Sequence, residues 1–157
     1  LDGHEDARQK VVTFYNTLGN HLTAIEQRLK ELGGSPTHPL KQGVAAVAGV
    51  AAGVVDKMRT SEAAKDLRDD YTAVNHAIIA YEMMYTTAVA AGDQQTADLC
   101  KRHLKDNAGF VMEINNFMPK LVLDELREDG LQVKDGAQAQ AEQMVHEIWQ
   151  QPPHVMA

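Results

Sequence analysis

The sequence predicts an all-α protein, an antiparallel four-helix bundle followed by a short C-terminal amphipathic helix. Apolar residues recur at alternating spacings of four and three along several long segments, which is typical of amphipathic helices. The 11 glycines and 5 prolines lie mostly at the ends of these segments. No segment is predicted to form a strand. With 157 residues, the chain is expected to form one domain around a single core.

A first helix is expected over residues 5–32. Its apolar stripe consists of Val11, Tyr15, Leu18, Leu22, Ile25, Leu29 and Leu32. The sequence Gly33-Gly34-Ser35-Pro36 should end this helix, because glycine permits a left-handed C-terminal cap and proline cannot continue the hydrogen-bond ladder.

A second helix is expected over residues 39–58, with proline tolerated in its first turn. This segment consists largely of small residues, which let neighbouring backbones approach closely. Its three glycines lower helix propensity by roughly 1 kcal/mol each relative to alanine. Residues 39–58 therefore need tertiary contacts to remain helical.

A third and a fourth helix are expected on either side of Gly92. Thr60 or Ser61 can cap the third helix, and Asp93 can cap the fourth, which should end at Pro119. The seam of the third helix consists of Leu67, Tyr71, Val74, Ile78, Tyr81, Tyr85 and Ala88. The seam of the fourth consists of Thr96, Cys100, His103, Asn107, Phe110, Ile114 and Phe117. Because the turn between them is very short, the two helices must pack as an antiparallel hairpin.

The segment after Pro119 is predicted to be an appendage to the bundle. It should contain a short helical extension over residues 120–128, a loop over 130–136 and an amphipathic helix over 137–150 that carries Trp149. We therefore expect a helical bundle over residues 1–119, and a C-terminal helical extension and tail over 120–157.

Composition excludes several classes of function. The formal charge of −7 argues against nucleic-acid binding, which needs a basic face. The longest uncharged apolar stretch, residues 43–55, is shorter than the roughly 17 to 25 residues of a membrane-crossing helix. A single cysteine excludes an intramolecular disulfide framework. No glycine-rich phosphate loop follows a strand. We expect a cytoplasmic protein with no nucleic-acid or membrane partner.

The seam of the fourth helix places His103 and Asn107 one turn apart, with Cys100 one turn earlier. The structural interpretation is a core histidine that bonds a neighbouring helix, because buried polar groups usually find protein partners. The functional interpretation is a polar pocket or a vestigial set of metal ligands, in which His21 and His103 could hold a metal if they converge with Asp106 or Glu113. No Glu-x-x-His pair of the di-iron type occurs on the third or fourth helix.

The remaining polar and sulfur-containing residues are given structural interpretations. His76 is expected to be exposed, and Cys100 to act as a small buried apolar residue. The methionines Met83, Met84, Met112 and Met118 are expected to fill the core. The acidic clusters are expected to be solvated surface. They consist of Asp66, Asp69 and Asp70, and of Glu125, Glu128 and Asp129.

The order of segments resembles a family of bacterial ferritin-like proteins, the YciE/YciF-like stress-associated group. Three stretches carry the resemblance, over roughly residues 10 to 120. They are QRLKELGGSPTHPLK, LRDDYTAVNHAIIAYEMMYTTAVAAGD and TADLCKRHLKDNAGFVMEINNFMP. The resemblance implies a ferritin-like fold.

The resemblance also implies where a metal centre would lie. The family's inward Glu and Gln of the first helix fall near Thr17 or Leu18 and on His21. The Glu-His-x-Glu of the third helix falls on Val74, Asn75 and Ala77. The glutamates of the fourth helix fall on Asp106, Asn107 and Ala108, and of these only Asp106 keeps a carboxylate. The chain thus resembles a ferritin-like scaffold whose di-metal centre has been lost.

Three functional hypotheses follow. The first is a protein with no catalytic activity and no cofactor, acting through its surface and its assembly. The second is an iron- or manganese-binding protein or oxidoreductase with a rearranged site around His21, His103, Asp106 and Glu113. The third is a module whose helix over 137–150 docks on another chain. We expect a homo-oligomer or a protein partner.

Overall fold

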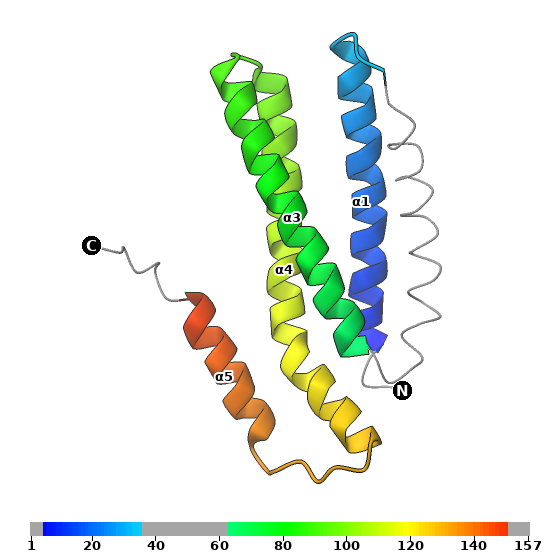
Figure 1. Ribbon diagram of the computed structural model, residues 1–157, viewed down its shortest axis with the longest axis vertical. Coiled ribbons are helices and arrows are strands. Elements are labelled where there is room, and N and C mark those ends of the chain that lie inside the picture. The colour runs from blue at the N-terminus through cyan, green and yellow to red at the C-terminus, as the bar shows by residue number, and fades with distance from the viewer. Residues whose placement is uncertain (1–4, 36–62, 151–157) are drawn as a thin grey trace, which may run out of the picture.

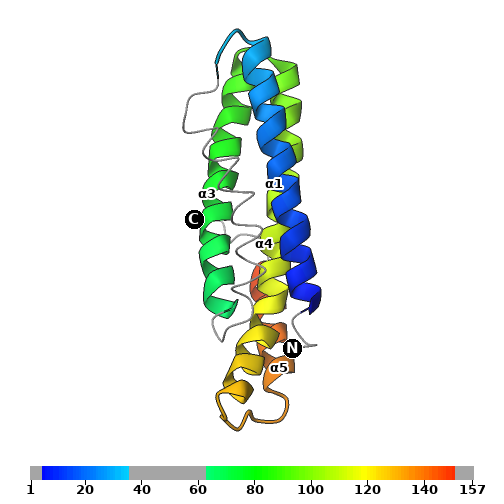
Figure 2. The same ribbon diagram turned by 90° about the vertical axis from the view of Figure 1, so that its right-hand side faces the viewer.

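The computed structural model describes residues 5–35 and 63–150. The described helices are α1 (Glu5–Glu31), α3 (Ala63–Ala90), α4 (Gln94–Glu128) and α5 (Ala137–Gln150). Figures 1 and 2 show α1, α3 and α4 side by side along a common direction, with α5 beside the second half of α4. The structure confirms the all-α bundle with a short C-terminal helix. The helix predicted over 39–58, and the predicted caps Thr60 and Ser61, lie outside the described residues.

The two predicted helix boundaries at glycine are confirmed. Gly33 follows α1 with φ +80°, and the N–H of Gly34 donates to the carbonyl of Leu29 at 2.9 Å. Gly92 has φ +71° in the turn between α3 and α4, and the Asp93 carboxylate accepts from the N–H of Thr96 at 3.0 Å. Glycine adopts this left-handed conformation at little cost, so it can end α1 and form the tight turn between α3 and α4.

Arg28 joins the end of α1 to the α3–α4 turn. Its guanidinium donates to Asp93 Oδ1 at 2.7 Å, to Thr96 Oγ1 at 2.8 Å and to Gln95 Oε1 at 3.0 Å. The hydrogen bond from Arg28, followed by those from Thr96, lowers the pKa of Asp93 to about 2. The N-cap of α4 is therefore also the attachment point of α1.

The structure corrects the predicted end of the fourth helix at Pro119. α4 runs without interruption from Gln94 to Glu128, with Pro119 inside it. Proline lacks the N–H that would bond the carbonyl of Asn115, and it usually kinks a helix. Figure 1 shows the last turns of α4 slanting away from the line of its first half. Packing of Leu121, which is buried in the core, offsets the lost hydrogen bond.

The core consists of two apolar clusters. The larger cluster lies between α1, α3 and α4 and includes the stacked rings of Phe14 and Phe110, whose centroids are 3.7 Å apart. The smaller cluster, nearer the α3–α4 turn, contains Tyr81, Leu99 and Cys100. The predicted burial of Cys100 is confirmed, because its side chain is fully buried.

Several residues predicted to be inside are exposed. Met83 is 67% exposed, and Met84, Tyr85, Met112 and Leu32 are exposed as well. The prediction that Met83, Met84 and Met112 fill the core was therefore wrong. The prediction that Tyr85 and Leu32 lie on buried seams was also wrong. A periodic pattern gives the direction of a side chain on its helix, but not how far the neighbouring helix extends.

Two carboxylates predicted to be solvated instead connect helices. Asp70 accepts a hydrogen bond from the hydroxyl of Tyr15 at 2.9 Å, and burial raises the pKa of Asp70. Glu125 accepts from the backbone N–H of Ala64 at 2.8 Å, at the start of α3. A carboxylate is favourable at a helix N-terminus, where backbone N–H groups lack partners.

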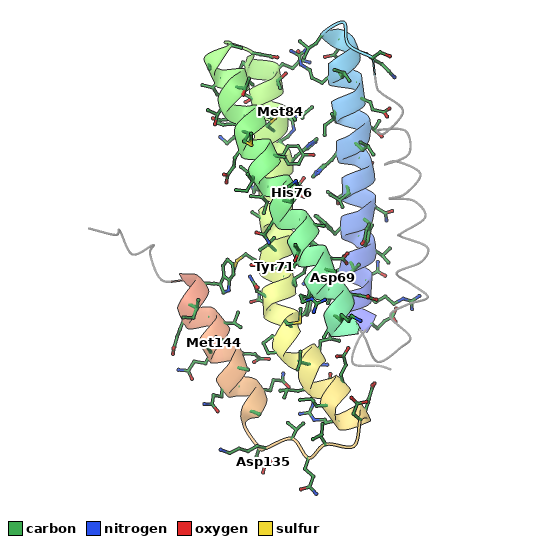
Figure 3. All side chains as sticks on the ribbon, in the orientation of Figure 1. Asp69, Tyr71, His76, Met84, Asp135 and Met144 are labelled. Carbon is green, nitrogen blue, oxygen red and sulfur yellow. The ribbon has the colours of Figure 1, made fainter. Side chains whose placement is uncertain are left out.

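α5 packs against α4 but buries little of itself. None of its described side chains is fully buried, and Met144 and Ile148 are 54% and 62% exposed. The ring of Trp149 meets the ring of Tyr71 edge to face, with centroids 6.5 Å apart, and Figure 3 shows Tyr71 beside the C-terminal end of α5. Among the described helices, none has the length and apolar character to cross a membrane.

Candidate functional site

A layer of polar side chains separates the two apolar clusters. The inner polar layer consists of His21 on α1, Tyr81 on α3, and His103 and Asn107 on α4, with Asp106 at its edge. His21, His103 and Asn107 are buried, at 5%, 5% and 0% exposure. His103 and Asn107 lie one turn apart, so the seam of α4 that is apolar elsewhere presents an imidazole and an amide at this level.

His21 links the layer to solvent through Asp106. The distance from His21 Nε2 to Asp106 Oδ2 is 2.9 Å, and the two side chains are 6% and 49% exposed. An ionised carboxylate can only accept, so Nε2 carries the proton and donates. In the neutral ring Nδ1 is then an acceptor, and it has no hydrogen-bond partner in the described part of the chain.

His103 is enclosed by two other rings. Its ring stacks on that of His21 with centroids 3.7 Å apart and planes 15° apart, and its Nδ1 lies 3.2 Å from the hydroxyl of Tyr81. Burial, followed by the positive charge that His21 and Arg102 can carry, lowers the pKa of His103 to about 4. His103 is therefore neutral near pH 7, and its tautomer decides which of Nδ1 and the Tyr81 hydroxyl donates the hydrogen bond between them.

Burial also favours the uncharged forms of Tyr81 and of the neighbouring Cys100. Burial, with a smaller contribution from Cys100, raises the pKa of Tyr81 to about 12. Burial also raises the pKa of the Cys100 thiol, which argues against a thiolate nucleophile there. Neither side-chain polar atom of Asn107 has a hydrogen-bond partner within the described ranges. Burial thus favours the uncharged forms of His103 and Tyr81, while Asp106 at the edge of the layer is half exposed.

The structure brings together three of the four predicted metal ligands. His21, His103 and Asp106 meet in the layer, whereas Glu113 lies farther along α4 and pairs with Lys10 at 3.5 Å. A metal lies in the plane of the imidazole that binds it, about 2 Å from the nitrogen. Two parallel rings 3.7 Å apart cannot both direct a lone pair at one ion. Residues 5–35 and 63–150 contain no group of three His, Cys, Asp or Glu side chains placed to hold a metal.

The other histidines lie away from this layer. His76 is exposed on α3, as predicted, and Figure 3 labels it about midway along that helix. His146 lines a cavity of about 490 Å³ between α4 and α5, with Glu142 and Asn115 among its neighbours. His4, His38 and His154 lie outside the described residues.

Tyr81 is the member of the layer that sequence reasoning missed as a polar partner. In an antiparallel hairpin, residues equally far from the turn lie opposite one another. Tyr81 and His103 are both eleven residues from Gly92. Their contact therefore follows from the position of the turn, although the apolar period of each helix taken alone does not reveal it.

The fold and its inner layer define a helical bundle of ferritin-like architecture with a buried layer of polar side chains in its core. The chain belongs to the family described as "Domain of unknown function (DUF892)", whose sequence model matches residues 5–127 and whose fold is ferritin-like. The match covers α1, α3 and nearly all of α4. The chain matches no curated protein and no solved structure.

Proposed function

We propose that this protein is a non-catalytic ferritin-like bundle that acts through assembly or partner binding. The observation that carries the proposal is the set of donors in the inner polar layer. Metal centres in helix bundles are built from several inward carboxylates together with histidines. Among residues 5–35 and 63–150, the groups of this layer are two imidazoles, an amide and a phenol, and the carboxylate at its edge, Asp106, is already bonded to His21.

The chemistry of iron and manganese supports this reading. Both ions favour hard oxygen ligands in number, and the positions that the YciE/YciF-like resemblance assigns to glutamates include Leu18 and Val74. Val74 is buried in the larger apolar cluster, and Leu18 packs against it. An apolar side chain at an inward position contributes to packing but cannot ligate.

The surface of α5 supports an interaction role. A 14-residue helix is marginal in isolation and relies on burial of its apolar face. Within this chain Met144 and Ile148 remain exposed beside the contact with α4. A partner that covers this face would supply the missing burial.

The resemblance to the YciE/YciF-like group supports a bacterial, cytoplasmic protein made in response to stress. The compartment and the stress are tested together by fractionating the source cells and measuring the abundance of the protein under osmotic, oxidative and starvation conditions. A level that is constant across all of them would contradict the stress association.

Elemental analysis of the purified protein tests the main proposal. We expect less than one tenth of an iron or manganese ion per chain after purification without chelators. About two ions per chain would overturn it. A variant with Asp106→Asn should have the same metal content as the wild type, which serves as the matched control.

The second candidate is an iron- or manganese-binding protein or oxidoreductase with a site around His21, His103 and Asp106. The observation that favours it is the buried Nδ1 of His21, which lacks a partner among the described residues. As placed, the stacked rings do not fit a single ion, so one ring would have to turn. Loss of metal and of any iron- or peroxide-dependent activity on His103→Ala would support this candidate, and unchanged values would remove it.

A further inference from the structure

A groove runs between α1 and α4 on the outside of the bundle. We call it the α1–α4 groove; it has a volume of about 350 Å³ and is floored by Phe14 and Phe110. Three residues on its α4 side are Lys105, Gly109 and Glu113. They are spaced by four residues, so they lie one above another along one face of the helix.

Gly109 is unusual for its position in the middle of α4. Glycine weakens a helix relative to alanine, and such a residue usually has a packing or functional reason. Apart from its chain neighbours and the backbone of its own helix turns, a Cβ added at Gly109 would meet no atom of the described chain within 4 Å. Nothing in the described part of this chain requires a glycine here, whereas a second backbone approaching the groove would.

The charges beside Gly109 are arranged as a palindrome. When two copies of one helix cross antiparallel about a two-fold axis, each residue before the crossing point faces the residue equally far after it. With the axis at Gly109, Lys105 of one copy faces Glu113 of the other, and the same pair forms a second time. The next residues outward on this face, three positions beyond each of these, are Arg102 and Asn116, which face each other. No like charges therefore meet at these positions.

We propose that a second copy of this chain docks in the α1–α4 groove, with the two α4 helices crossing at Gly109. This inference rests on the proposed function, because it names the partner in assembly and the surface that binds it. The absence of a side chain at Gly109 lets the two backbones approach. The two Lys105–Glu113 pairs then fix the antiparallel orientation.

Glu113 can serve this pairing while keeping its contact within the chain. It lies 3.5 Å from Lys10, and both side chains remain about half exposed. A carboxylate has two oxygens and can accept from two ammonium groups. Because the paired side chains lie at the solvent-exposed edge of the interface, salt screens them. The dimer should therefore weaken as ionic strength rises.

Charge reversal with mixing tests the orientation. By size exclusion with light scattering, the full-length wild type should be dimeric at low salt. Lys105→Glu and Glu113→Lys should each be monomeric, because each places like charges opposite one another. An equimolar mixture of the two variants should be dimeric, because both pairs become complementary again. Lys101→Glu on α4, which does not line the groove, is the matched control and should stay dimeric.

Two substitutions at Gly109 test the crossing point. Gly109→Leu should abolish the dimer while raising the thermal midpoint of the chain, since the new side chain has space and favours the helix; a lower midpoint and an unchanged mass would contradict the proposal. Gly109→Cys should give a disulfide-linked dimer under mild oxidation, whereas Lys101→Cys should not. The native Cys100 is buried and should not react.

The outcomes separate this inference from the proposed function. A wild type that is monomeric at all concentrations, or a mixture of the two charge variants that stays monomeric, overturns the groove interface. If the wild type is dimeric, the groove variants are unaffected and truncation before Ala137 yields a monomer, then assembly stands but its surface is α5. If the chain also holds two metal ions, the proposed function fails independently of the groove.

Discussion

The imidazole of His21 in α1 lies parallel to that of His103 in α4, with ring centroids 3.7 Å apart. Burial of His103 in this layer, followed by the positive charges that His21 and Arg102 can carry, lowers the pKa of its imidazole. Because His103 is buried where helices distant in sequence meet, protonation of its imidazole is linked to the stability of the whole bundle.

We expect the protein to lose stability between about pH 6.5 and pH 4 because of His103. The pKa of His103 is about 4 in the folded protein, against 6.5 when exposed. In this range the unfolded chain binds the proton and the folded chain does not, so stability rises with pH and is complete above about 6.5. The total effect is about 3 kcal/mol.

Urea unfolding at a series of pH values measures this effect. His103→Gln should flatten the dependence between pH 4 and 6.5. Asp70→Asn is an informative comparison, because burial raises the pKa of Asp70 and its contribution has the opposite sign. A wild-type profile identical to that of His103→Gln would show that His103 is not buried as a neutral group.

Asn107→Leu should stabilise the protein or leave it unchanged. Both polar atoms of this fully buried amide lack partners in the described ranges, and an unsatisfied buried group costs about 1–3 kcal/mol. Leucine has a similar size and removes that cost. Asn107→Asp, which buries a charge, should destabilise strongly. Guanidinium denaturation measures the stability of both variants. A large loss of stability for Asn107→Leu would show that the Asn107 amide has a hydrogen-bond partner, such as a bound water.

Phe110→Ala should be the most damaging single truncation in the core. Phe110 stacks on Phe14 at 3.7 Å and is 5% exposed, so its removal leaves a cavity and costs about 3–5 kcal/mol. Phe117→Ala, on the same helix but only partly buried, should cost less. Thermal unfolding followed by circular dichroism compares them, and equal losses would argue against the stacked pair as the centre of the larger cluster.

Arg28 and Asp93 should be energetically coupled. Arg28→Gln breaks the contact between α1 and the α3–α4 turn, whereas Asp93→Asn weakens both that contact and the cap of α4. The double variant should therefore be less destabilised than the sum of the two single variants. The coupling should shrink in high salt because the pair is near the surface. Strict additivity at low salt would mean that the ion pair contributes nothing.

The local elements could be predicted because they depend on local physics. The positive φ of Gly33 and Gly92 and the cap at Asp93 follow from residue types that favour those conformations. The 4 and 3 spacing correctly identified the inward faces that carry His103 and Asn107. The end of α4 was not predictable in the same way, because proline at 119 is tolerated only where tertiary packing offsets its missing hydrogen bond.

Within the described residues, the sequence by itself determined where α1, α3 and α5 lie, where α4 begins, the short hairpin turn and the level at which polar side chains enter the core. The tertiary structure alone decided which of those side chains meet. His21 and Asp106 are 85 residues apart, and the sequence does not contain the helix crossing that brings them to 2.9 Å while leaving Glu113 with Lys10. A helical period fixes the angle of a residue around its own axis, whereas contact between helices depends on their relative shift and rotation, which the whole core sets by packing.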